Sequence, residues 1–334
     1  MKPATSTPYG WQFWYILFSI ACSVYAALAN SALLESYQEQ LIKEYFDFSR
    51  TIYQPQTIYL AESVLFPWIA FLMGAGKHWL MYKLFCSFAT VLSVPAIAYF
   101  AMKYFDHPLK AWAFLLVFLL TYRNIWGPYY IGMPDPLTVV LLVAVSFERR
   151  PLAVFFLTTL AAVTHFSITF IAIFCFISLL ICSISKTKEF KVAAVKYAVL
   201  GLIAGKLLLA IWFYRFKYQL NTRIDYVTDL GLMHFVERYL ADVTGYWLTP
   251  GWPFLVVFLA LVLWAINSKQ YLFALMMLGT ITLAYIALFF TRDGLRVFAV
   301  AIVCAYVYML KEFIDQIFAR WTQKPTEQPQ RTHS

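Results

Sequence analysis

Apolar segments follow one another along almost the whole chain, and they constrain its fold more than any other feature. Hydrophobic residues make up 62% of the sequence and charged residues only 13%, whereas a soluble domain is about half apolar and a quarter charged. In lipid, every backbone polar group must be satisfied within the protein, and a helix does this within one segment. The sequence therefore predicts an all-α, polytopic bundle of membrane helices that contacts the lipid bilayer.

Hydropathy and charge together predict about ten transmembrane helices. The predicted spans are residues 11–29, 79–102, 111–122, 136–147, 151–164, 166–184, 192–214, 253–266, 271–290 and 297–318. With both ends of the chain inside, fourteen Lys and Arg and six acids fall in the inner segments, against eleven of each outside. This asymmetry follows the positive-inside rule. The net charge of +9 therefore reflects topology in the plasma (inner) membrane, with cytoplasmic termini, and not nucleic-acid binding.

The long first outer loop is expected to carry interfacial helices. Residues 31–56 are too polar to span, and residues 58–73 form a short apolar run broken by Pro67, which predicts an interfacial or re-entrant helix. Residues 1–318 are interpreted as one integral-membrane domain, and residues 319–334 as a disordered cytoplasmic tail. A cleaved signal peptide ending near Ala29 is an alternative for the first span.

The five cysteines all lie inside apolar runs, and none forms a CxxC motif or a Cys/His cluster. They are expected to be buried small hydrophobes rather than metal ligands or disulfide partners. No metal site is predicted from these residues.

A polar segment, residues 123–136, interrupts the apolar pattern with three prolines and two glycines. Irregular backbone at membrane depth is tolerated only where it meets water or lines a cavity. We interpret the segment as one wall of an outer site, with Arg123 as a binding residue. Asp135 is either a plain helix cap or a carboxylate that binds substrate hydroxyls or a metal, so a divalent cation stays open as a cofactor.

Two other predicted outer turns carry candidate ligands. His165, at the turn of a helical hairpin, is either a structural histidine or a phosphate ligand or general acid–base group. Arg292 and Arg296 lie one helical turn apart and form a predicted anion site at a helix start, shaped by Asp293. Snorkelling of the two arginines to the interface is the alternative.

The acidic residues of the first outer loop are the richest source of a general base. Most are expected to form a solvated face of an amphipathic helix. A base that activates an acceptor hydroxyl has to be an outer carboxylate, and we favour Asp47 and Glu62 for that role.

The chain resembles the GT-C superfamily of membrane glycosyltransferases. The resemblance rests on the first outer loop, the apolar stretch 65–72, the sequence Met133-Pro-Asp-Pro-Leu-Thr138 and the hairpin turn Thr164-His-Phe-Ser167. It implies transfer of a sugar from a polyprenyl-phosphate carrier to a glycan or lipid acceptor of the cell envelope, on the extracytoplasmic face. It also implies that Glu35 or Asp47 is the catalytic base and that Arg292 and Arg296 hold the carrier phosphate.

Two other functions remain open. An exopolysaccharide or O-antigen polymerase of the EpsG or Wzy type would share spans, outer arginines and lipid-linked substrates, but would join oligosaccharides. A lipid-linked-sugar transporter should show internal repeats and a polar path through the membrane, whereas only Lys206 is a deep charge here. Polysaccharide biosynthesis by a transferase is therefore the favoured interpretation.

Overall fold

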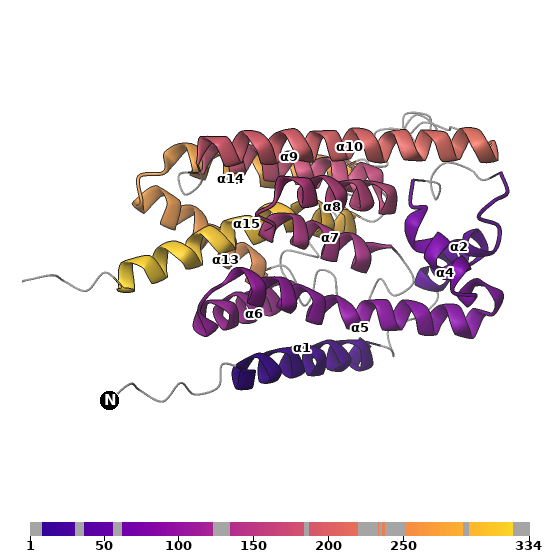
Figure 1. Ribbon diagram of the computed structural model, residues 1–334, viewed down its shortest axis with the longest axis horizontal. Helices are drawn as coiled ribbons and strands as arrows, with labels where there is room; N and C mark the ends of the chain where they lie inside the picture. The colour runs from indigo at the N-terminus through magenta and orange to yellow at the C-terminus, as the bar shows by residue number, and fades with distance from the viewer. Residues whose placement is uncertain are drawn as a thin grey trace, which may run out of the picture.

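The computed structural model describes residues 9–30, 37–55, 62–122, 134–183, 187–219, 233, 236–237, 252–289 and 294–322. The helices in this part of the chain are α1 (Tyr9–Asn30), α2 (Tyr37–Arg50), α4 (Leu65–Leu72), the 3-10 helix η2 (Ala75–Lys77), α5 (Trp79–Tyr104), α6 (Pro108–Tyr122), α7 (Asp135–Phe147), α8 (Pro151–Thr164), α9 (Phe166–Cys182), α10 (Lys188–Phe216), α13 (Trp252–Asn267), α14 (Tyr271–Phe289) and α15 (Gly294–Thr322) (Figure 1). The all-helical prediction is confirmed. Among these helices α5, α10 and α15 are long and apolar enough to cross a membrane, and the number of ten spans stays a prediction.

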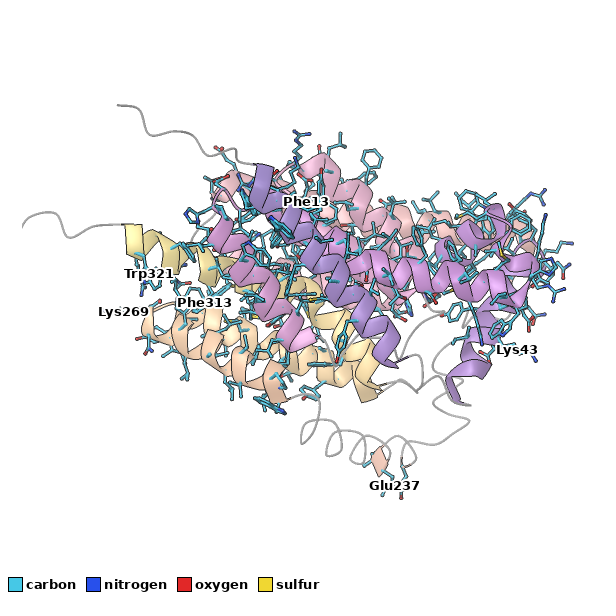
Figure 2. The ribbon with its side chains drawn as sticks, turned by 90° about the horizontal axis from the view of Figure 1, so that it is seen from below. Phe13, Lys43, Glu237, Lys269, Phe313 and Trp321 are labelled. Atoms are coloured by element: carbon cyan, nitrogen blue, oxygen red, sulfur yellow. The ribbon has the colours of Figure 1, made fainter. Side chains whose placement is uncertain are left out.

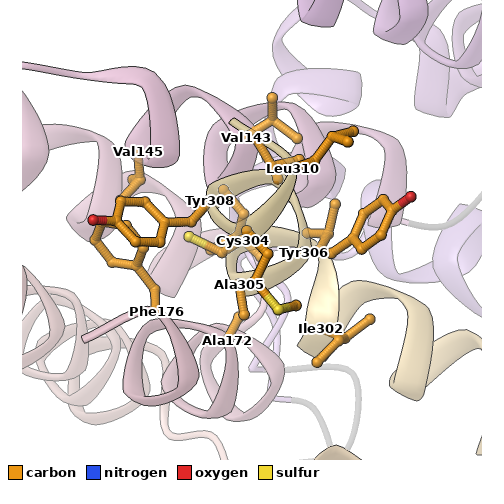
Figure 3. Close-up of a cluster of buried hydrophobic side chains, with 14 of the residues drawn as sticks. Val143, Val145, Ala172, Phe176, Ile302, Cys304, Ala305, Tyr306, Tyr308 and Leu310 are labelled. Carbon is orange, nitrogen blue, oxygen red and sulfur yellow. The ribbon is translucent and has the colours of Figure 1, made fainter. Parts of the chain in front are cut away.

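Helix α15 forms the centre of the bundle. It packs against α6, α7, α9, α13 and α14, and every residue from Val297 to Leu310 is at most 4% exposed. Figure 3 shows Ile302, Cys304 and Tyr308 of this helix among side chains of α7 and α9. A helix that is apolar on all sides is stable only when it is surrounded, and the other helices supply that surrounding.

Buried polar groups fix the position of α15 within the bundle. The Ser146 hydroxyl of α7 donates to the Cys304 carbonyl at 3.0 Å, and the hydroxyls of Thr121 and Tyr306 are 2.8 Å apart. The buried Lys311 ammonium donates to the Ser146 carbonyl at 2.6 Å and lies 4.5 Å from the centre of the Tyr308 ring. These partners offset part of the cost of burying a charge.

Glycines bring α8 and α10 close together. Gly201 and Gly205 lie four residues apart on α10, as in small-xxx-small helix contacts of membrane proteins. A Cβ atom added at Gly205 would lie 2.4 Å from Cβ of Ala162, and one added at Gly201 would lie 2.7 Å from the Phe155 carbonyl oxygen. The two helices can approach this closely only because both positions are glycine.

The connections between helices gather at two ends of the bundle. Lys43 lies at one end, whereas Lys269 and Trp321 lie at the other (Figure 2). Hydrogen bonds join segments at the second end: Gln270 to Gln316 at 3.1 Å and Arg320 to Ser268 at 3.1 Å. We call the first the α2 end and the second the tail end.

A small helical cap covers the α2 end. It consists of α2, α4 and η2, which lie between the ends of α5 and α10 (Figure 1), and it has its own apolar core around Phe48 and Phe66. The eight residues of α4 span about 12 Å, too little to cross a bilayer. The Tyr218 hydroxyl, whose pKa is raised by burial, donates to the Ile52 carbonyl at 2.6 Å and ties the end of α10 to the cap.

Substitution of Gly205 by Ala should destabilise the bundle by about 1–3 kcal/mol, because the new methyl group overlaps Ala162 and forces α8 and α10 apart. Gly279→Ala in α14 is the matched control, because an added Cβ there has no described atom of another helix within 4 Å. Thermal unfolding of both variants in detergent measures the difference. Equal melting temperatures would contradict this account of the α8–α10 contact.

Candidate functional site

Two short helices have one terminus beneath the cap: α7 begins there and α8 ends there. Helix α7 has 13 residues and α8 has 14, so each spans about 20 Å, well below the roughly 30 Å of a bilayer core. The partly buried Leu137, Val163 and Phe166 pack against the core of the cap. The cap therefore covers the helix ends at which two of the predicted site residues lie.

Asp135 and His165 are both buried at these helix ends. Asp135 is 3% exposed and His165 is 6% exposed. Asp135 is the first residue of α7 and follows Pro134 in the N-cap position, so it is not itself the cap residue, and its charge is favoured by the helix dipole. His165 is the extended residue between α8 and α9. The structure places both residues in the protein interior, beneath the cap.

Glu62, from the segment before α4, contacts the turn between α8 and α9. Its carbonyl oxygen accepts a hydrogen bond from the backbone amide of Phe166 at 3.3 Å, and its Oε2 accepts one from the Ser167 hydroxyl at 2.5 Å. The segment that leads into α4 is thereby attached to the hairpin turn next to His165. Glu62, a candidate general base from the sequence, is thus brought to the neighbourhood of His165.

Lys206 completes this group of side chains. Its Nζ lies 3.7 Å from Oε1 of Glu62 and 4.4 Å from the centre of the Phe166 ring. The Lys206 side chain is 49% exposed, whereas that of Glu62 is 19% exposed. The deep charge expected from the sequence therefore pairs with a carboxylate. We call Glu62, His165, Phe166, Ser167 and Lys206 the Glu62 cluster.

The Glu62 cluster combines three chemical properties. Its carboxylate already accepts a hydrogen bond from an alcohol, its ammonium provides positive charge, and its aromatic ring provides an apolar face. A carboxylate within hydrogen-bond distance of a hydroxyl can accept the proton of that hydroxyl, and an ammonium can stabilise negative charge that develops nearby. Next to Glu62, the 1% exposed Ser63 hydroxyl has no hydrogen-bond partner within the described residues.

The other predicted site residues add no described contact to this cluster. Asp47 is exposed on α2, and no described contact joins its side chain to Glu62. Arg296 belongs to the first turn of α15, but the structure does not describe its side chain. The remaining candidates lie outside the described residues: Glu35, Arg123, Arg292 and Asp293. In the described ranges, no group of three His, Cys, Asp or Glu side chains could hold a metal ion.

Ser167 and Lys206 were not predicted as site residues. The sequence shows Ser167 next to the hairpin turn and Lys206 as the one deep charge, but it does not show that they meet Glu62. The pairing depends on how residues 62–64 cross the α8–α9 turn. An isolated lysine in an apolar span was the one usable signal, because such a residue normally has a partner.

Comparison with known proteins adds no relative. No protein-family model, no curated protein and no solved structure matches the chain.

Replacement of Ser167 by Ala should lower the free energy of unfolding by about 1–2 kcal/mol, because a hydrogen bond to a charged carboxylate is lost. Ser178→Ala on the same helix is the control: among the described residues, its hydroxyl donates to the Phe174 carbonyl one turn earlier and to no other segment. Thermal unfolding in detergent compares the two variants. An equally small effect of both would show that the Glu62–Ser167 contact does not hold the cap on the hairpin.

Proposed function

We propose that this protein is a membrane glycosyltransferase that moves a sugar from a polyprenyl-phosphate carrier to a glycan or lipid acceptor of the cell envelope. The observation that carries the proposal is the Glu62 carboxylate, which accepts a hydrogen bond from a hydroxyl and lies beside the Lys206 ammonium. The resemblance to the GT-C superfamily agrees with this assignment. Its members take their base from the first outer loop, to which Glu62 belongs.

The proposed reaction assigns each group a role. Glu62 removes the proton from the acceptor hydroxyl as that oxygen attacks C1 of the donor sugar. The bond between C1 and the phosphate oxygen breaks, and the carrier phosphate leaves with the bonding electrons. Lys206 and Arg296 stabilise the negative charge on the departing phosphate. The proton remains on Glu62 until it passes to solvent.

Glu62 is a better candidate for the base than Asp47. The side chain of Glu62 is 19% exposed and fixed by Ser167 and Lys206, whereas Asp47 lies on the exposed face of α2. A catalytic carboxylate has to be held in one geometry by its neighbours. The described contacts hold Glu62 in this way.

Lipid analysis of cells tests the reaction. Cells without the gene, or with Glu62→Gln, should accumulate a polyprenyl-phosphate-linked monosaccharide, because loss of a general base slows transfer by about 100-fold or more. Cells with Arg296→Ala should accumulate the same lipid, and cells with Asp47→Asn should resemble the wild type.

Other outcomes of this experiment have distinct meanings. Accumulation only in Asp47→Asn cells would move the base to Asp47 and leave the reaction intact. Accumulation of a complete repeat unit on polyprenyl diphosphate would indicate a polymerase. No change in any carrier lipid would contradict glycosyl transfer.

The orientation of the bundle is tested by cysteine labelling. Lys43 and Lys269 are both exposed and lie at opposite ends (Figure 2). In intact cells, a membrane-impermeant maleimide should label Lys43→Cys but not Lys269→Cys. Cys86, Cys175 and Cys304 are buried, whereas Cys22 and Cys182 are partly exposed, so the unsubstituted chain measures the background labelling. The reverse pattern would put the Glu62 cluster on the cytoplasmic side and contradict the proposal.

A further inference from the structure

A second candidate site lies at the tail end, away from the Glu62 cluster. A cavity of about 460 Å³ opens there between the last turns of α5 and α7 and the link to α8. Three cations line it: Lys103 from α5, and Arg149 and Arg150 from the link. All three are exposed and can therefore reach a ligand.

The cations that line this cavity outnumber its lining acids. Its one lining acid, Glu148, accepts hydrogen bonds through Oε1 from the backbone amides of Arg149 and Arg150, both at 2.8 Å, and so supports the turn that begins α8. Over the described ranges, no carboxylate oxygen lies within 4.0 Å of a side-chain nitrogen of Lys103 or Arg150. The lining therefore carries three cations and one acid, and Lys103 and Arg150 have no acidic partner among the described residues.

Arg149 is held in place by Tyr104. Its Nη2 donates to the Tyr104 carbonyl at 3.1 Å, and its guanidinium carbon lies 4.6 Å from the centre of the Tyr104 ring. An arginine fixed in this way loses little further entropy when it binds an anion, and its remaining N–H groups match phosphate oxygens.

Helix length predicts that the cavity lies at the depth of lipid headgroups. The 26 residues of α5 span about 39 Å, more than the roughly 30 Å of hydrocarbon in a bilayer. Lys103, in the last turn of α5, is therefore expected at the polar boundary. The apolar walls precede the cations along the chain: Phe100 comes before Lys103 on α5, and Ala144 and Phe147 of α7 come before the two arginines of the link. The lining of the cavity is therefore charged at the helix ends and apolar toward the centre of the bundle.

We propose that this cavity binds a phosphate group, supplied by an anionic lipid headgroup or by a soluble phosphate ester. Basic pockets between membrane helices bind phosphate-bearing headgroups, and the adjoining aromatic wall suits the first carbons of an acyl chain. The proposal does not rest on glycosyl transfer, because none of its residues belongs to the Glu62 cluster.

Binding to the purified full-length protein in a neutral detergent tests the proposal. The lipid arm titrates dioleoyl phosphatidylglycerol, with zwitterionic phosphatidylcholine as the charge control, and counts bound lipid by native mass spectrometry. The soluble arm titrates glycerol 3-phosphate by calorimetry. The pocket variant is Lys103→Gln with Arg150→Gln. The matched control, Lys188→Gln with Lys196→Gln, removes two exposed cations of α10 that do not line the cavity.

The affinity for phosphatidylglycerol should be roughly 10- to 30-fold lower in the pocket variant and unchanged in the control. The reason is that each cation near the membrane surface raises the affinity about fivefold, and the pocket variant lacks two. The charge-preserving variant, Lys103→Arg with Arg150→Lys, should retain binding and shows that the result does not come from misfolding. If glycerol 3-phosphate shows this pattern and phosphatidylglycerol does not, the site binds a soluble phosphate ester. Equal losses in the pocket and control variants, or no binding of either probe to the wild type, would overturn the proposal.

Discussion

The structure depends on the burial of the first half of one helix, α15. Helix α15 has almost no exposed side chain from Val297 to Leu310, so its neighbours must enclose it on all sides. In lipid there is no hydrophobic force between apolar helices, and their association relies on close packing and buried hydrogen bonds. The Ser146–Cys304 and Thr121–Tyr306 contacts supply such bonds. Enclosure of α15 fixes the positions of α6, α7 and α9.

Helix length then decides where polar chemistry is found. Because α7 and α8 are much shorter than α10, their ends lie below the end of the longer helix, and the cap fills the resulting space. Glu62 enters the bundle with the cap and meets Lys206 there. At the tail end, the link between α7 and α8 presents Arg149 and Arg150 next to Lys103. The same short helices therefore produce a polar site at each end.

The sequence predicted local structure well and long-range pairing poorly. Apolar run length and Pro151 predicted the start of α8, and the polarity of residues 31–56 predicted that α2 does not span. His165 and Asp135 were correctly placed at helix ends, because proline and the hairpin turn are local signals. The Glu62–Ser167 contact joins residues 105 positions apart, and no periodicity encodes such a pairing. The central position of α15 was also not predicted, because a uniformly apolar helix looks the same whether lipid or protein surrounds it.

The order of the chain has a consequence for biogenesis. All the helices that enclose α15 precede it in the sequence, so during synthesis they leave the translocon before the helix that joins them. Until α15 arrives, the faces of α7 and α9 that pack against it lack this partner, and the Ser146 hydroxyl lacks the Cys304 carbonyl as its acceptor. The helices around α15 can therefore take up their final positions only after translation of residues 294–322, whereas contacts such as α8 with α10 and α1 with α5 can form earlier. A ribosome that stalls before this segment leaves an open assembly, which membrane proteases can recognise.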